Sequence, residues 1–267
     1  GRSVMVACTQ ETETFHAIAE ELTLDAPRTL NIREMAGWSD EGKNSTPKMA
    51  ALIKDALVDR PLSRSMSLES HGRCLIYTDA KNSPASVDAG LGLAERLDGT
   101  LGVTVLIANP GDDMMARRSP GMVSSGIIRK AEGHFTNFKL TIDNFAETVP
   151  HGRAALAFGP SSDGIESSCD LLIDMTGGTP LFTGWEKRDG YYRVAGDDTA
   201  AVAALEFEVA PMIGTFEKPI YVNFDENLCA HSRNQIDGCS RCLDVCPAGA
   251  ITSAGDIVSI DPSICGG

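Results

Sequence analysis

The sequence has no long apolar run and no export signal. Its longest apolar stretches, such as 103–108 (VTVLIA), have the length of strands and fall far short of the roughly 20 residues that a membrane-spanning helix needs. The first residues, GRSVMVACTQETE, contain neither an apolar core of the right length nor a cleavage site. We therefore expect a cytoplasmic protein with no membrane span and no signal peptide.

Positive charge is also scarce. The chain has 23 lysines and arginines against 37 aspartates and glutamates, which gives a net charge of −14. Such a surface repels nucleic acids and anionic membranes, so we expect no nucleic-acid partner. Two explanations of the excess remain open: the acids keep the protein soluble, or they match a basic docking face on a protein partner.

Apolar and amphipathic segments alternate along the chain, which predicts an α/β protein. We divide it into an N-terminal α/β segment (1–66), a central α/β domain (67–215) and a tail (216–267), with a Ser-rich linker at 58–72. The order strand, loop, helix, strand after Arg73 predicts a Rossmann-like domain. The expected strands are 3–9, 29–34, 74–79, 103–108, 171–176 and 221–224, the expected hairpins are 126–142 and 250–260, and the expected helices are 15–22, 48–57, 86–97 (N-cap Ser86) and 197–210 (Asp198 or Thr199 near its start).

The central domain lacks the glycine motif of a nucleotide-binding domain. The turn after its first strand reads TDAKNSPASVDAG and contains no G-x-G-x-x-G, whose glycines permit a tight turn close to a pyrophosphate. We therefore expect a degenerate Rossmann-like domain without flavin. Gly177 and Gly178 after the strand at 171–176 could form another phosphate-binding turn or only a turn, and both interpretations stay open. No linear motif for a catalytic triad or a carboxylate pair is present.

Cysteines are concentrated at one end of the chain. Three of the eight are scattered, at positions 8, 74 and 169. Disulfide frameworks are typical of short secreted chains, so thiols in a long chain without an export signal favour metal or cluster binding. The five remaining cysteines, which we predict to be metal ligands, are Cys229, Cys239, Cys242, Cys246 and Cys265.

The spacing of the tail cysteines predicts an iron–sulfur site. Cys239-x2-Cys242-x3-Cys246-Pro247 matches the last three cysteines and the proline of the bacterial run C-x2-C-x2-C-x3-C-P. The gap before Cys239 has nine residues instead of two, and we interpret residues 230–238 as an inserted loop. Cys229, Cys239 and Cys242 would then serve one cluster and Cys246 a second. Cys265 would open the second motif, and because the chain stops at Gly267 we expect a fragment whose [4Fe-4S] set is incomplete.

Two alternatives remain at this site. Zinc ribbons also use thiolates, but they pair two C-x2-C knuckles, whereas the x3 gap and the Cys-Pro pair favour iron–sulfur chemistry. His231 and Arg233, in the inserted segment, could donate hydrogen bonds to cluster sulfurs or be exposed loop residues.

The tail segment CAHSRNQIDGCSRCLDVCPAGAI resembles bacterial 4Fe-4S ferredoxin-type proteins. Together with TFEKPIYVNFDENLC and LLIDMTGGTPLF, it is similar to a family of larger multi-domain iron–sulfur proteins associated with molybdenum-type formate dehydrogenase systems. VACTQETETF and NIREMAGW resemble the N-terminal region of the flavin-binding subunit of heterodisulfide reductase, with Ala36 where that family has a cysteine. The resemblance implies that Cys8 is a ligand of an upstream cluster; the alternative is a small residue at a strand end.

The sequence therefore predicts an iron–sulfur electron-transfer protein or subunit. Its partner would be a redox protein, either a dehydrogenase subunit or a ferredoxin-type carrier, and the chain would carry electrons for an oxidoreductase rather than be a catalyst itself. Two alternatives stay open: a flavin- or nicotinamide-dependent oxidoreductase related to the flavin-binding subunit of heterodisulfide reductase, and an interaction module that holds no cluster.

Overall fold

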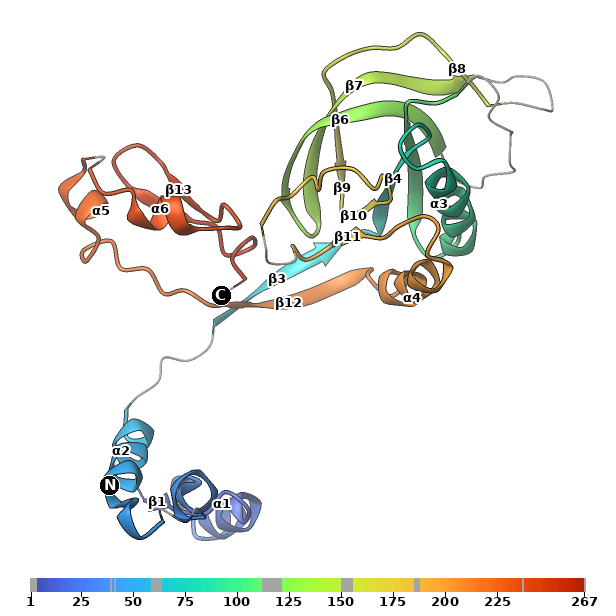
Figure 1. Ribbon diagram of the computed structural model, residues 1–267. Coiled ribbons are helices and arrows are strands. Elements are labelled where there is room, and N and C mark those ends of the chain that lie inside the picture. Colours follow the sequence, from blue (N-terminus) through green and yellow to red (C-terminus); the bar gives the residue numbers. More distant parts are fainter. Residues whose placement is uncertain are drawn as a thin grey trace. The chain divides into compact units, whose positions relative to one another are not determined.

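The chain folds into two compact units, Gly1–Leu62 and Ser63–Gly267, in a computed structural model (Figure 1). Within the described ranges, no helix is both long enough and apolar enough to cross a membrane. The predicted three-part division stays a prediction. The structure describes residues 4–38, 40, 42–58, 64–111, 122–149, 156–184, 188–236 and 238–266.

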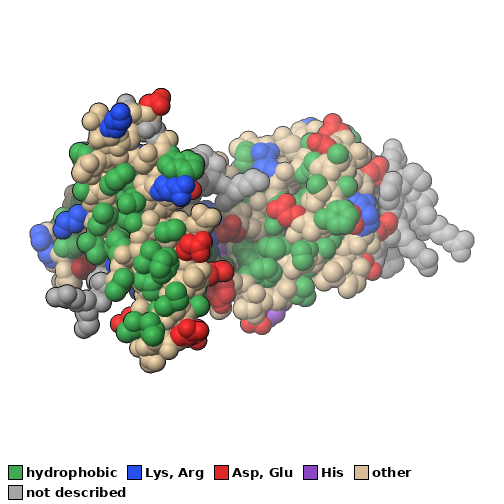
Figure 2. Space-filling model, turned by 90° about the horizontal axis from the view of Figure 1, so that it is seen from below, with side chains coloured by type: hydrophobic (Ala, Val, Ile, Leu, Met, Phe, Trp, Pro, Cys, Tyr) green, Lys and Arg blue, Asp and Glu red, His purple; other side chains and the backbone are tan. Residues whose placement is uncertain are grey.

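The N-terminal unit is small and has little regular sheet. Two parallel two-residue strands are joined through the first helix, and two short helical turns lead to the second helix. Large apolar side chains such as Leu24 and Trp38 lie at its surface, and hydrophobic side chains are visible among acidic ones on the face of the molecule in Figure 2. Its elements are β1 (Met5–Val6), α1 (Thr12–Glu21), β2 (Arg28–Thr29), the π-helical turn η1 (Arg33–Gly37), the 3-10 turn η2 (Gly42–Asn44) and α2 (Thr46–Ala56).

The strands predicted at 3–9 and 29–34 are much shorter in the structure. The second ends because Asn31 starts a helical turn: its side-chain oxygen accepts a hydrogen bond from the backbone N–H of Glu34 at 3.0 Å. Asparagine and aspartate side chains compete with strand pairing in this way. The prediction of α2 is confirmed, with Pro47 in its first turn, where a proline costs no hydrogen bond.

The larger unit is built on a mixed sheet of eight strands in its described part, which confirms the α/β class. The strand order is β11-β10-β4-β5-β6-β7-β8, and β9 pairs with β7. The run from β11 to β6 is parallel and the rest is antiparallel. The strands are β4 (Arg73–Asp79), β5 (Gly102–Ala108), β6 (Met122–His134), β7 (Asn137–Val149), β8 (Ala157–Phe158), β9 (Ile165–Cys169), β10 (Leu171–Asp174) and β11 (Tyr191–Arg193).

Both faces of the parallel strands are buried. In β10, Leu171 and Ile173 join a core on the side of helices α3 (Pro84–Leu97) and α4 (Thr199–Val209), whereas Leu172 joins a second core with Leu106 and Phe138. Burial on both faces explains why these strands are continuous apolar runs instead of alternating ones. Figure 1 shows α3 and α4 on the same side of the sheet.

Helix α3 begins earlier than predicted. Its N-cap is Ser83 and not Ser86, whose hydroxyl instead accepts a hydrogen bond from the backbone N–H of Asp79 at 3.2 Å. Gly90 lets the helix approach β4, because a Cβ at this position would lie 2.7 Å from Cγ2 of Thr78. The prediction of α4 is confirmed: the Asp198 side chain caps it by accepting from the N–H of Ala201 at 2.9 Å.

The long hairpin of β6 and β7 confirms the prediction at 126–142. Gly133 has a φ of +95°, and a Cβ there would lie 2.1 Å from the carbonyl oxygen of Asn137, so the turn requires glycine. The linker prediction is wrong for Arg64–Ser70, which forms β3 and pairs with β12 (Gly214–Ile220). The strand predicted at 221–224 is absent, because β3 and β12 stop pairing at Arg64 and Ile220.

The cysteine tail after β12 has two short helices and one hairpin. The hairpin at 250–260 was predicted and is confirmed: Ser253 pairs with Val258 across a turn that contains Gly255 at φ +77°. The elements of the cysteine tail are α5 (Ala230–Asn234), α6 (Arg241–Val245), β13 (Ile251–Ser253) and β14 (Val258–Ile260).

Candidate metal centre

Cys229 sits at the start of α5. It is the N-cap residue, with extended backbone angles, and its carbonyl oxygen accepts a hydrogen bond from the N–H of Arg233 at 2.9 Å. The backbone N–H of Ser232 and then its hydroxyl group hold the pKa of the Cys229 thiol below its ordinary value. Hydrogen bonds to the charged form stabilise a thiolate, which is the form that binds metal.

The next three cysteines surround α6. Cys239 is exposed before the helix, half-buried Cys242 lies within it, and half-buried Cys246 ends it with an extended conformation. The chain then turns through Pro247 to Gly249, whose N–H donates to the carbonyl oxygen of Cys246 at 3.3 Å and whose φ is +66°. The Cys-Pro pair therefore redirects the chain away from the helix.

Cys265 follows the hairpin. Its N–H donates to the carbonyl oxygen of Asp261 at 3.0 Å, and the N–H of Asp261 itself donates to the carbonyl oxygen of Ala250 at 2.8 Å. These bonds fold the end of the described chain back onto the segment that follows Cys246. Cys265 is half-buried.

All five tail cysteines are free thiols. Among the residues with described positions, no three His, Cys, Asp or Glu side chains are grouped so that they could hold a metal ion. Thiolates are the ligands that iron–sulfur clusters use, and the pKa of one of these thiols, that of Cys229, lies below its ordinary value, so the residue types suit such a cluster although their described positions do not group them.

The segment between Cys229 and Cys239 is not the open loop that the sequence suggested. Residues Ala230–Asn234 form α5, which ends at Gln235 in the left-handed conformation. His231 is 1% exposed, so the prediction of an exposed loop residue is wrong for it, while Arg233 is exposed. His231 Nε2 lies 2.8 Å from the carbonyl oxygen of Gly255 and donates to it, because a carbonyl only accepts.

His231 and its neighbour therefore join α5 to the β13–β14 hairpin. The hydroxyl oxygen of Ser232 accepts a hydrogen bond from the N–H of Val258 at 3.0 Å, on the same hairpin. Sequence reasoning missed this contact because it spans more than twenty residues. In the sequence, the hairpin showed only alternating polar and apolar residues. Such alternation does not indicate which segment the hairpin packs against.

Cys8 lies outside this tail. It is a half-buried free thiol just after β1, and Ala36, at the position where the resembling family has a cysteine, is buried in η1. The proposed upstream cluster stays a prediction.

The turn after β4 directs its amides toward an internal carboxylate. The Asp79 side chain is 6% exposed and accepts hydrogen bonds from the backbone N–H groups of Lys81 (2.9 Å) and Asn82 (3.0 Å). The side-chain amides of Asn82 and Asn109 also donate to it, at 2.8 and 3.2 Å. In a nucleotide-binding turn, such amides are available to a phosphate.

The double glycine after β10 forms a turn around a second buried aspartate. Asp174 accepts from the N–H of Thr176 at 3.0 Å and from the hydroxyl of Tyr191 at 2.8 Å, and it pairs with Arg193 at 3.3 Å. The Gly178 N–H donates to the Thr176 hydroxyl at 3.2 Å, while Gly177 takes a φ of +68°. The Gly178 amide is thus already engaged within the turn.

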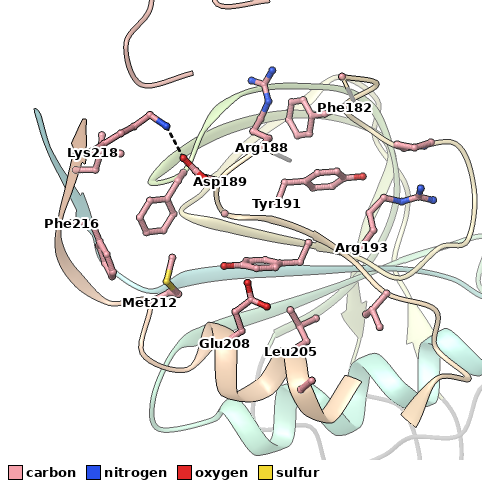
Figure 3. Close-up of a pocket in the computed structure, with 18 of the residues that line it drawn as sticks. Phe182, Arg188, Asp189, Tyr191, Arg193, Leu205, Glu208, Met212, Phe216 and Lys218 are labelled. Atoms are coloured by element: carbon pink, nitrogen blue, oxygen red, sulfur yellow. Dashed lines mark hydrogen bonds and ion pairs between the residues drawn. The ribbon is translucent and has the colours of Figure 1, made fainter. Parts of the chain in front are cut away.

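A cavity of about 740 Å³ lies beside β11 and α4. Figure 3 shows Phe182 and Arg188 at one end and Leu205 and Glu208 of α4 at the other. Two of its charged groups pair with each other: Lys218 Nζ lies 2.6 Å from Asp189 Oδ2. Sequence reasoning missed this cavity because its walls come from separate segments of the chain.

Two tyrosines that line the cavity, Tyr191 and Tyr192, have raised pKa values. Burial first, and then the nearby carboxylate of Asp174, raise the pKa of Tyr191 above its ordinary value. Burial and the carboxylate of Glu208 raise the pKa of Tyr192 to about 12. Both phenols therefore stay neutral.

No protein-family model matches the chain, and no curated protein and no solved structure is significantly similar to it. Any functional conclusion must therefore come from the residues and their chemistry.

Proposed function

We propose that this chain is an iron–sulfur protein that transfers electrons. The observation that carries the proposal is the run of tail cysteines, which matches the ferredoxin spacing from Cys239 to Pro247 and stays outside the apolar core as free thiols. Free cysteines that serve only to pack are among the most buried residues in proteins. If the tail cysteines had only that role, we would expect them to be buried.

The proposed ligands fall into two sets. Cys229, Cys239 and Cys242 supply three of the four ligands of one [4Fe-4S] cluster, and Cys246 and Cys265 belong to a second, as in ferredoxins, where the cysteine before the proline ligates the other cluster. A bound cluster supplies a site for one-electron transfer. The chain's own contribution is to present thiolates, with Ser232 stabilising that of Cys229, and to redirect the backbone after Cys246.

The α/β body of the larger unit is proposed to be a Rossmann-like platform without flavin; the tail is proposed to be ferredoxin-like. In chain order, the parallel strands β4, β5, β6, β10 and β11 lie in the order 5-4-1-2-3, the arrangement of the first strands of a doubly wound sheet. The Asp79 carboxylate uses the amides of the turn where a pyrophosphate would bind, and an anion there would meet a like charge. This supports a structural role for the platform.

The proposed partner is a redox protein, a dehydrogenase subunit or a ferredoxin-type carrier, in the cytoplasm. The net charge of −14 supports docking to a basic face, because opposite charges accelerate encounter. The resemblance to iron–sulfur proteins of formate dehydrogenase systems and to the flavin-binding subunit of heterodisulfide reductase fits the same role.

The test is metal analysis of protein purified without oxygen and reconstituted with iron and sulfide. We expect iron and acid-labile sulfide in equal amounts, a broad brown absorbance, and an EPR signal after reduction. A Cys169→Ala variant serves as the control, because Cys169 is buried in the platform and should not affect iron content.

Three results would argue against the proposal. Colourless protein with one zinc and no iron would indicate a zinc site. A flavin spectrum or tight NAD(P)H binding would restore an oxidoreductase with its own cofactor in the platform. Protein that binds neither iron nor zinc would indicate an interaction module.

A further inference from the structure

The cavity beside β11 and α4 has the size and the walls of a small-molecule site. Its volume is about 740 Å³, and pockets for small molecules in proteins have volumes of about 300–1,000 Å³ and mainly apolar and aromatic walls. Three of the four tyrosines and three of the nine phenylalanines of the chain line it: Phe135, Phe182, Tyr191, Tyr192, Phe216 and Tyr221. These walls suit a ligand with a flat ring, because aromatic side chains pack favourably against another ring.

Contacts within the protein hold several of these aromatic side chains in place. The rings of Phe135 and Phe216 meet edge to face, with their centroids 5.1 Å apart. Phe182 and Tyr191 form a second contact of this kind at 5.0 Å, and the Tyr191 hydroxyl donates to Asp174 at 2.8 Å. Side chains that are already ordered lose little conformational freedom when a ligand binds.

One cation of the cavity is buried and has donors to spare. Lys218 is 9% exposed, and an ammonium group has three N–H donors. Within the described residues, its partner is Asp189, whose Oδ2 lies 2.6 Å from Nζ and whose side chain is 63% exposed. Burying an ammonium group is costly unless its N–H groups are bonded. Lys218 therefore has donors for a ligand as well as for Asp189.

The sign of the charge changes along the cavity. Lys218 and Arg188 also line an adjoining pocket of about 200 Å³, where Asp189 is the one carboxylate of the described lining. Two cations against one carboxylate give this end a net positive charge. In Figure 3, the three side chains lie on the side of the cavity opposite Leu205 and Glu208 of α4. A ligand with one negative group would therefore place that group at the Lys218 end.

The two arginines of the cavity are bonded to the protein's own backbone. Arg188 Nη1 donates to the carbonyl oxygen of Gly133 at 2.5 Å, and its Nη2 donates to that of Ala248 at 2.6 Å. Arg193 Nη2 donates to the carbonyl oxygen of Gly178 at 2.6 Å. Both guanidinium groups add positive charge while their donors serve the backbone, whereas the described partner of the lysine is a single carboxylate.

We propose that this cavity binds a small aromatic carboxylate, with the ring between the aromatic walls and the carboxylate on Lys218. A charge-assisted hydrogen bond from a buried ammonium group would fix the orientation of the ligand. The excess of one positive charge at this end favours a monoanion over a phosphate dianion, which would be repelled more strongly by Asp189. The inference does not depend on the proposed function, because no cysteine and no cluster takes part.

The test is calorimetric titration of the full chain, without reconstitution, using naphthoate as the probe. We expect saturable binding with a dissociation constant of about 1 mM or below. Naphthylmethanol keeps the ring and lacks the charge, and cyclohexanecarboxylate keeps the charge and lacks the aromatic ring. Each should bind about tenfold more weakly than naphthoate. Naphthoate should also slow hydrogen exchange at 191–193 and 214–220.

Substitutions of the lysine test its role. Lys218→Gln should weaken naphthoate binding about tenfold and leave binding of naphthylmethanol unchanged, whereas Lys218→Arg should retain most of the affinity because the charge remains. Lys130→Gln is the matched control: it removes the same charge from β6, where Lys130 pairs with Glu132 at 2.7 Å and is 61% exposed. This control should bind naphthoate as wild type does.

Several outcomes would overturn the inference. In wild type, these are no saturable binding of naphthoate at millimolar concentration, or equal affinity for naphthoate and naphthylmethanol; both tests hold even if Lys218→Gln does not fold. Equal weakening in Lys218→Gln and Lys130→Gln would indicate a general charge effect and would also overturn it. A chain that binds naphthoate but takes up no iron would contradict the proposed function alone.

Discussion

Cysteines of the platform and cysteines of the tail differ in the physical properties that matter for metal binding. Cys74 and Cys169 are 2% and 3% exposed, and burial raises the pKa of both thiols, that of Cys169 to about 12. Cys229 is partly exposed, and the backbone N–H and hydroxyl group of Ser232 hold its pKa low. The same side chain is thus an apolar packing group in one region and a candidate ligand in the other, and the environment decides which.

The largest expected effect comes from removing a proposed ligand. Cys242→Ala should prevent cluster assembly, measured as loss of iron, sulfide and the reduced EPR signal, because each cluster needs its thiolates. Cys169→Ala should retain iron and instead lower the free energy of unfolding by about 1 kcal/mol, since it removes a small buried group. If Cys242→Ala and Cys169→Ala contained equal amounts of iron, the proposed difference between ligand cysteines in the tail and packing cysteines in the platform would be wrong.

A second contrast concerns thiol reactivity in the native apo protein. The tail cysteines should react readily with an alkylating reagent. Cys74 and Cys169 should react more slowly by a factor of at least about 10³, because the reagent reaches them only when the core opens. Mass spectrometry of timed samples distinguishes the positions. Denaturant should abolish the difference, and rapid native labelling of Cys74 would contradict its burial.

The platform also contains an ion pair between a buried carboxylate, Asp170, and a half-exposed arginine, Arg73. Burial acts to raise the pKa of Asp170, but hydrogen bonds from the Arg73 side chain and backbone and from the His71 N–H outweigh it and leave that pKa below its ordinary value. The guanidinium lies 2.7 Å from the carboxylate, whose side chain is fully buried. Asp170→Asn should therefore destabilise the larger unit by about 2 kcal/mol in denaturant unfolding.

The pH dependence of that effect has a fixed sign. A carboxylate whose pKa is lower in the folded state stabilises fully above its unfolded pKa of about 3.9, and this stability is lost as pH falls through the lower folded value. Below about pH 4, wild type and Asp170→Asn should therefore converge. Glu166→Gln, an exposed change of the same charge on β9, should stay within about 0.5 kcal/mol of wild type.

The smallest expected effect is at Ser232. Ser232→Ala removes the hydroxyl group that helps to lower the pKa of Cys229 but leaves the backbone N–H, so the pH at which Cys229 becomes alkylated should rise modestly. Labelling of Cys229 as a function of pH measures this. Ser240→Ala is the matched control, since its hydroxyl donates to Asp244 instead of a thiol. An unchanged profile in Ser232→Ala would mean that the backbone N–H alone tunes the thiol.

Local patterns predicted the parts of the fold that local interactions fix. The apolar runs predicted strands β4, β5 and β10, and Asp198 predicted the start of α4, because periodicity and capping act within a few residues. Competition between neighbouring residues over where an element starts or ends was harder to predict. Helix α3 starts after Ser83 instead of Ser86, and Asn31 ends a predicted strand. At Asn31, one side-chain hydrogen bond outweighed a weak strand propensity.

The sequence by itself determined which residues are candidate ligands, because thiol chemistry and ligand spacing are properties of the chain. Only the tertiary structure decided that His231 is buried against the β13–β14 hairpin and that Arg188 reaches the carbonyl oxygen of Ala248. It also assembled the cavity beside α4 from distant segments. These contacts join residues separated by 24 to 60 positions, and no periodicity or spacing rule carries information over that distance.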